Sequence, residues 1–92
     1  MKKVTFQDTV CVLTFDRYNN NNRTAITLYE EETGEPFMHA TVNLPADLND
    51  DEVFIKNYSE NEGIAEALTE AGIIKPIKDI GGIIKAKLLC TS

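Results

Sequence analysis

A single segment of this 92-residue chain has the apolar spacing of an α-helix, and that segment restricts the fold more than any other feature. Its apolar residues recur at intervals of three and four, which aligns them along one helical face: Ile64, Ala67, Leu68 and Ala71. Ser59, with Glu62 three residues later, predicts a capping box at the start of the helix. Gly72 suits the left-handed position after the last turn, from which Ile73 can pack back on Leu68. We therefore predict one helix between Ser59 and Gly72.

The apolar residues outside this segment alternate with polar ones, as they do in β-strands with one buried face. The segments that we predict to be extended are residues 10–18, 24–30, 37–44, 52–58, 73–76 and 83–90. Turns are indicated by four consecutive asparagines at 19–22, by Gly34 and by the Gly81–Gly82 pair. Residues 1–92 are thus expected to form a single α+β domain, a mostly antiparallel sheet of five or six strands with one helix packed on one face.

We expect neither a signal peptide nor a membrane-spanning segment. Residues 1–6 have a basic start without an apolar stretch, and no run approaches the roughly 20 apolar residues that span a membrane. Cys11 and Cys90 lie in strand-like segments near opposite ends of the chain. They are expected as reduced thiols in the core, although a disulfide between them stays open for an exported chain. We predict a cytoplasmic protein without a membrane partner.

The net charge of −6 is distributed unevenly along the chain. Between residues 47 and 70, eight acids face the single base Lys56: Asp47, Asp50, Asp51, Glu52, Glu60, Glu62, Glu66 and Glu70. The following segment is basic, with Lys75, Lys78, Lys85 and Lys87 against Asp79. Contact with a nucleic-acid backbone requires an excess of clustered bases, so the acidic chain predicts no direct nucleic-acid partner. A protein with a basic surface is the expected partner.

The residues that usually carry catalysis or metals are scarce. His39 is the only histidine; it lies on the outward side of its predicted strand and has no partner for nucleophilic catalysis. Residues 47–51 look like the start of a calcium loop, but Glu52 stands where the loop requires glycine and Tyr58 where it requires glutamate. We therefore expect no enzymatic activity, no metal and no cofactor.

Acidic and aromatic side chains remain as candidates for binding. The candidate binding residues are Asp50, Asp51, Glu52, Tyr58, Glu62, Glu66 and Glu70. Aromatic rings beside an acidic rim are typical of protein-binding surfaces. Tyr29, Phe37, His39 and Tyr58 could instead stack on a nucleotide-like ligand, or lie in the core under the helix. The sequence leaves these readings open.

The most distinctive motif is Ile-Lys-Asn-Tyr-Ser-Glu-Asn-Glu-Gly at 55–63, in which Asn57 and Asn61 could satisfy the backbone of a turn. Together with residues 41–45 and 68–74, this motif resembles an uncharacterised family of small proteins, a domain of unknown function from bacteriophages and mobile elements of gut and Gram-positive bacteria. The resemblance covers residues 23 to 74. It implies a phage or mobile-element origin and brings no established activity or catalytic residues.

These features together predict a non-catalytic protein that binds a host protein. In its most specific form, the acidic segment imitates nucleic-acid charge and inhibits a host defence or nucleic-acid enzyme. The alternative is a protein that binds or sequesters a small nucleotide-like ligand, as an oligomer with pockets between chains. A homodimer formed through an exposed edge strand, such as the last strand, also stays open.

Overall fold

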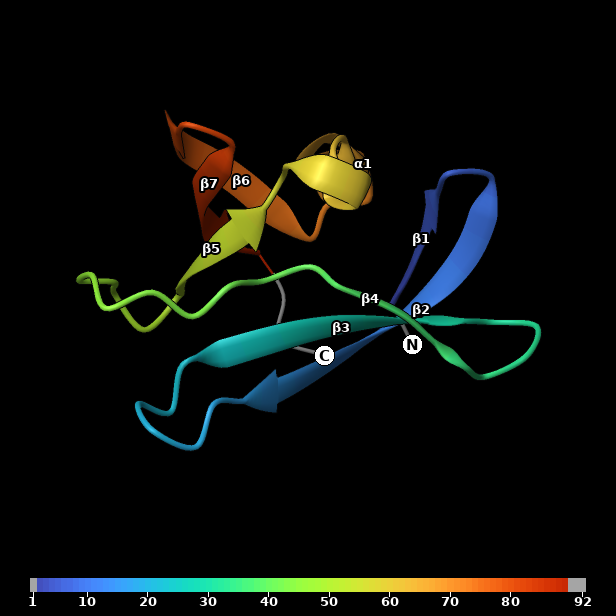
Figure 1. Cartoon of the computed structure of the whole chain (residues 1–92), viewed down its shortest axis with the longest axis horizontal. Helices are drawn as coiled ribbons and strands as arrows, with labels where there is room; N and C mark the ends of the chain where they lie inside the picture. The colour runs from blue at the N-terminus through green and yellow to red at the C-terminus, as the bar shows by residue number, and fades with distance from the viewer. Residues whose placement is uncertain (1, 90–92) are drawn as a thin grey trace.

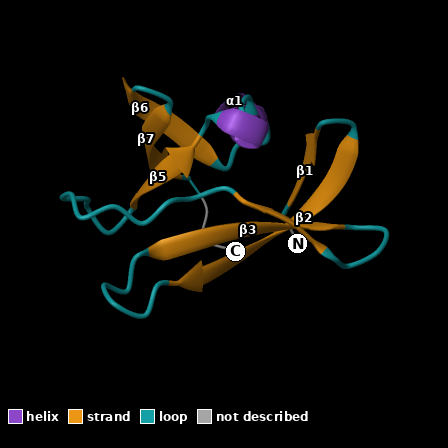
Figure 2. Ribbon diagram, in the orientation of Figure 1, coloured by secondary structure: helices purple, strands orange, loops and turns teal. Residues whose placement is uncertain are grey.

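The computed structural model describes residues 2–89, in which seven strands form two antiparallel sheets beside one α-helix (Figure 1). The predicted α+β class, with antiparallel strands and a single helix, is confirmed. The strands divide into sheets of four and three rather than forming the one sheet of five or six strands that the sequence predicts. Figure 2 shows this division, with the helix on the side of the smaller sheet.

The first sheet is a meander whose strands follow one another in chain order: β1 (Lys3–Phe6), β2 (Thr9–Arg17), β3 (Thr24–Glu30) and β4 (Pro36–His39). The sequence reading missed β1, which joins β2 through a two-residue turn. Gln7 and Asp8 in that turn both have positive φ, 53° and 60°, a combination that matches the twist of a hairpin. The predicted turns at 19–22 and at Gly34 are confirmed.

The second sheet has the order β5-β7-β6, with β5 (Glu52–Lys56), β6 (Ile74–Ile80) and β7 (Ile83–Leu88). The last strand is therefore central rather than exposed, and β6 forms the edge. Pro76 is tolerated in β6 because an edge strand does not need every N–H for pairing, and a bulge follows it between Pro76 and Lys78.

The two sheets are connected where the predicted strand 37–44 leaves the first sheet. β4 ends at His39, and the next residue bonds to both sheets. The Ala40 N–H donates to the Ile26 carbonyl of β3 at 2.9 Å, while the Lys56 N–H of β5 donates to the Ala40 carbonyl at 2.8 Å. Thr41 then bridges to Ile55. Apolar and polar residues continue to alternate where the chain passes from the first sheet to the second. For this reason the sequence predicts one uninterrupted strand over residues 37–44.

The helix α1 (Ile64–Glu70) is shorter than predicted and does not begin with a capping box. Ser59 lies in a 3-10 turn (Ser59–Asn61) with a φ of 56°, and neither it nor Glu62 caps the helix. The acceptor is the Asn57 side chain, whose Oδ1 receives the N–H groups of Gly63 and Ala65, each at 3.0 Å. Asn57 thus accepts backbone N–H groups of the turn, as expected, and it also determines where α1 starts.

The predicted end of the helix is confirmed. Gly72 has a φ of 75°, and its N–H donates to the Thr69 carbonyl at 3.1 Å. The Ile73 N–H donates to the Leu68 carbonyl at 2.9 Å. These two bonds constitute a Schellman motif.

Both sheets and α1 share one hydrophobic core. α1 buries Ile64, Ala65 and Leu68, whereas Ala71, which the periodicity assigned to the apolar face, is exposed. Figure 1 shows α1 between the β1–β2 hairpin and the second sheet, and its contacts are with β1, β5 and β6. The largest fully buried side chains are Ile26, Leu28, Ile55, Ile64, Leu68, Ile73, Ile74, Val53 and Cys11. Cys11 is a buried free thiol, and Cys90 lies outside the described residues.

Candidate functional site

In chain order, the predicted acidic residues fall on either side of β5. Asp50 and Asp51 precede the strand and Glu52 begins it, whereas the acids of the helical segment follow its other end. Four steps along a strand cover about 13 Å. After α1 the chain returns toward Asp51, because the Leu89 N–H donates to the Ile73 carbonyl at 2.8 Å and the neighbouring Leu88 N–H donates to the Asp51 carbonyl at 2.6 Å.

Three of these acids are paired with lysines of the chain. Glu52 is only 10% exposed at its side chain, lies 3.7 Å from the Lys85 ammonium and accepts the Asn49 N–H at 2.9 Å. Asp51 pairs with Lys87 at 3.7 Å. A third pair joins Glu60 to Lys56 at 3.9 Å. Their charge is largely cancelled, which makes these three acids the least suited to attract a partner.

The acids on α1 are arranged differently, beside an open groove of about 390 Å³ between the helix and the β6–β7 hairpin. The groove is lined by Asn57, Ala65, Glu66, Thr69, Glu70, Pro76, Asp79 and Ile84. Pro76 and Ile84 lie on the helix-facing side of the second sheet, as the pairing of Pro76 with the buried Ala86 indicates. A seven-residue helix is about 10 Å long, and beside it Pro76 is exposed whereas Ile84 and Ala65 are buried, so Pro76 is the accessible part of the apolar floor.

Three carboxylates stand at the rim of this groove, those of Glu66, Glu70 and Asp79. Within residues 2–89, none of the three forms an ion pair. The Asp79 carboxylate accepts the Gly82 N–H at 3.0 Å, which holds it at the β6–β7 turn. Glu62, which is exposed, precedes the same helix. An apolar floor with uncompensated negative charge around it is thus assembled from α1 and the β6–β7 hairpin.

The aromatic residues and His39 do not come together in one place. Tyr58 is 39% exposed at the end of the second sheet, and the Lys56 ammonium lies 5.4 Å from its ring centre. Phe37 packs against the shared core. Tyr29 and His39 lie on the outer face of the first sheet, where the His39 Nδ1 lies 3.1 Å from the Thr27 hydroxyl. Phe37 and His39 line one open hollow of about 290 Å³ together with Lys56, but neither Tyr29 nor Tyr58 lines it.

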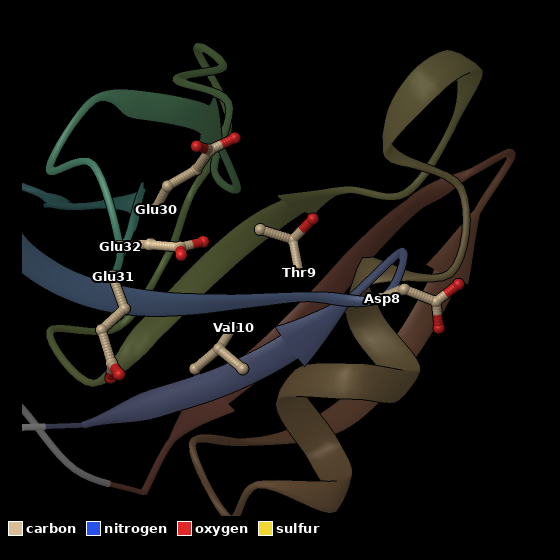
Figure 3. A pocket seen from close by; sticks show the side chains of 6 residues that line it. All are labelled: Asp8, Thr9, Val10, Glu30, Glu31 and Glu32. Carbon is tan, nitrogen blue, oxygen red and sulfur yellow. The ribbon is translucent and has the colours of Figure 1, made fainter.

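An acidic hollow that the sequence reading missed lies between the β1–β2 turn and the β3–β4 turn. It has a volume of about 600 Å³ and is lined by Asp8, Thr9, Val10, Glu30, Glu31 and Glu32. Figure 3 shows that its carboxylates point in different directions. Glu31 pairs with Lys3, and Glu30 accepts the Thr33 hydroxyl at 3.0 Å. The pairing of β2 with β3 brings the two turns together, and the Glu31 N–H donates to the Val10 carbonyl at 3.0 Å; no local pattern in the sequence indicates this approach.

Two further properties bear on chemistry. In the part of the chain that is described, no three His, Cys, Asp or Glu side chains are grouped so that they could hold a metal ion. Burial, and to a smaller extent the negative charge of Glu30, raises the pKa of the Cys11 thiol. This thiol is therefore protonated, and poorly nucleophilic, at neutral pH.

Over residues 2–89, no helix has the length and apolar character needed to cross a membrane.

Comparison with protein-family models, with curated proteins and with solved structures found no match. The resemblance of residues 23 to 74 to a phage and mobile-element family stays a prediction. No activity or binding residue can be transferred to this chain from a relative, and its function has to be argued from its own surfaces.

Proposed function

We propose that the protein is a non-catalytic binding protein that engages a basic protein surface through α1 and the adjoining groove. The observation that carries the proposal is the combination of an accessible apolar floor with the unpaired carboxylates of Glu66, Glu70 and Asp79. Protein interfaces commonly have an apolar centre and a polar rim. Charge of one sign on such a rim accelerates and orients the approach of a partner of opposite sign.

The position of Glu70 on α1 favours a role outside folding. Glu66 and Glu70 are four residues apart on α1, and like charges at this spacing destabilise a helix by about 0.2–0.5 kcal/mol. Glu70 is in the last turn, where the helix dipole disfavours a negative charge. Glu66 lies in the first turn, where the helix dipole favours a negative charge. Glu70, by contrast, is paired with no described lysine or arginine, so folding gains little from it, and binding gives a reason for its presence.

The proposed partner is a host protein with a basic surface in the cytoplasm. In the most specific form, the protein comes from a phage or mobile element and occupies a channel that normally holds nucleic acid. Glu62, Glu66 and Glu70 would then take the place of backbone phosphates. Asp50 precedes β5 and Tyr58 follows it, outside α1. Asp51 and Glu52 contribute less to the attraction of a basic partner, because each is already paired with a lysine.

Charge reversal on α1 tests this proposal. The tagged wild-type protein, the triple variant Glu62→Lys/Glu66→Lys/Glu70→Lys and a control variant would each be incubated with a lysate of a Gram-positive host. The control is Asp16→Lys/Glu32→Lys/Glu35→Lys, which makes the same change in net charge at exposed positions of the first sheet and its turns. Circular dichroism would first establish that all three proteins are folded.

We expect one basic protein to be retained by the wild type and the control and to be lost with the α1 variant. With the purified partner, titration calorimetry should show an affinity at least about tenfold lower for the α1 variant. Equal loss in both variants would indicate attraction by net charge alone, and equal retention in all three would place the binding surface elsewhere. Native mass spectrometry of the purified protein tests the alternative of a bound nucleotide-like ligand.

A further inference from the structure

The second sheet presents a basic face on a chain that is acidic overall. β7 alternates between the buried residues Ile84, Ala86 and Leu88 and the lysines that point the opposite way. Residues directly opposite one another in an antiparallel pair share a face, so the register of the sheet determines which side chains join them. The resulting lysine face contains five of the nine lysines and arginines of the chain: Lys56, Lys75, Lys78, Lys85 and Lys87.

Like charges on this face stand directly opposite one another. Lys75 of β6 pairs with Lys87 of β7, and Lys78 pairs with Lys85. Cross-strand pairs of like charge destabilise a sheet. Lysines on an edge strand prevent unwanted strand pairing, which is reason enough for those in β6. That reason does not extend to β7, because β7 is the central strand.

The ion pairs of the second sheet leave one side of the lysine face uncompensated. The lysines that pair with acids lie on β5 and β7: Lys56, Lys85 and Lys87. Lys75 and Lys78, on β6, form no ion pair with any residue from 2 to 89. Five lysines against three acids leave two positive charges on the face, 5 − 3 = 2. The Lys56–Glu60 and Lys87–Asp51 pairs are exposed, so an incoming anion can replace the acid at little cost there, whereas Glu52 is only 10% exposed at its side chain and stays paired with Lys85.

An exposed aromatic ring and an aliphatic side chain border these charges. Tyr58 follows Lys56 by two residues, and the Lys56 ammonium lies over its ring. Ile80 is 48% exposed and is paired with Ile83, on the same face as the lysines. Sheets that bind single-stranded nucleic acid combine these elements: ammonium groups contact the phosphates while aromatic rings stack on bases.

We propose that the lysine face binds the phosphate backbone of single-stranded nucleic acid, with Tyr58 stacking on a base. This goes beyond the proposed function, because α1 and its groove lie on the opposite face of the second sheet. It also replaces the expectation drawn from the net charge of −6. A net charge describes the whole chain, whereas a phosphate backbone responds to the charges within one Debye length, about 8–10 Å.

Fluorescence anisotropy with a fluorescein-labelled oligothymidylate, measured over a series of salt concentrations, tests the proposal. The wild-type protein should bind most tightly at low salt, with log K falling linearly against log salt. The variant Lys75→Ala/Lys78→Ala should bind at least about tenfold more weakly, and its salt slope should be shallower by about 1.4, which corresponds to two lost phosphate contacts. Tyr58→Ala should weaken binding about tenfold without changing the slope.

Two controls separate this site from general electrostatic attraction. Lys2→Ala/Lys3→Ala removes the same charge from the region of β1 and should bind like the wild type. The variant Asp16→Lys/Glu32→Lys/Glu35→Lys, at exposed positions of the first sheet and its turns, should keep both the salt slope of the wild type and its dependence on Tyr58. Thermal unfolding should show that Lys75→Ala/Lys78→Ala is at least as stable as the wild type, since it relieves the two lysine pairs.

The proposal would be overturned by the absence of binding at the lowest salt concentration, or by unchanged binding in the lysine variant. Binding of a labelled polyglutamate peptide as tight as that of the oligonucleotide, and insensitive to Tyr58→Ala, would also overturn it. In that case the lysine face would be a contact for acidic proteins. None of these outcomes depends on the partner of α1.

Discussion

At the scale of single residues, Asn57 determines where α1 begins. Its side-chain oxygen accepts two N–H groups at 3.0 Å, those of Gly63 and Ala65. We expect Asn57→Ala to lower the free energy of unfolding by about 1–2 kcal/mol, because both donors lose their acceptor. Ser59→Ala, at the residue that the sequence predicts as the cap, should change it by less than about 0.5 kcal/mol. Urea unfolding followed by circular dichroism measures both, and a larger loss for Ser59→Ala would contradict the assignment.

The buried thiol of Cys11 gives the protein a pH dependence on the alkaline side. Burial and the charge of Glu30 raise its pKa in the folded protein, so the folded state holds the thiol proton more tightly than the unfolded chain does. The resulting stabilisation is complete below the ordinary thiol pKa and is lost as the pH rises from that value through the raised, folded-state pKa.

We therefore expect the free energy of unfolding to fall over this alkaline interval, and to fall less steeply in Cys11→Ala. Urea unfolding at a series of pH values measures the two curves, and the difference between them removes the common titration of lysines and tyrosines. Curves that stay parallel across the interval would show that the thiol does not contribute.

At the scale of elements, two turns use glycine for different reasons. Gly72 ends α1 with a φ of 75°, and a Cβ added there would meet nothing within 4 Å. Gly82 connects β6 to β7 with a φ of 95°, and a Cβ added there would lie 3.3 Å from the Tyr58 Cβ. Replacement by alanine therefore has only a conformational cost at Gly72 and an additional steric cost at Gly82.

We expect Gly72→Ala to lower the free energy of unfolding by about 1–2 kcal/mol, the cost of a left-handed conformation for a residue with a Cβ. Gly82→Ala should lower it by more, because Tyr58 or the turn has to move. Thermal and urea unfolding would measure this order of the two variants. The reverse order would show that the β6–β7 turn adapts freely.

At the scale of the whole molecule, the two sheets are held together around Thr41. Its buried hydroxyl accepts the Ile26 N–H of β3 at 3.1 Å and lies 2.9 Å from the Tyr18 hydroxyl, while its backbone bridges to Ile55 of β5. One residue thus takes part in the bonding of both sheets.

We expect Thr41→Val to lower the free energy of unfolding by about 1–3 kcal/mol, because the shape is preserved but the Ile26 N–H loses its acceptor. The matched control is Thr14→Val on β2, a half-buried hydroxyl 3.4 Å from a carbonyl, for which we expect a change below about 0.5 kcal/mol. Urea unfolding and hydrogen exchange of the Ile26 amide provide two independent measurements. Equal effects of the two variants would show that the hydroxyl does not link the sheets.

The distribution of charge is also a property of the whole molecule. Counted along the sequence, the acids between 47 and 70 suggest one charged surface, yet the fold pairs three of them with lysines. The candidate residues on α1 could be foreseen, because a helix gathers neighbours in sequence on one side. The groove beside them and the lysine face could not, because both depend on the order β5-β7-β6.

Elements whose causes are local can be predicted from the amino-acid sequence. Alternation predicts β3, the left-handed glycine at 72 predicts the end of α1, and the asparagine run predicts a turn, because each depends on residues only a few positions apart. The way in which these elements combine depends on contacts between distant parts of the chain. The division into two sheets, the capping of α1 by Asn57 and the opposition of Lys75 to Lys87 arise from contacts across the chain. An alternating strand indicates which of its faces is buried, but it carries no information on which strand will be its neighbour.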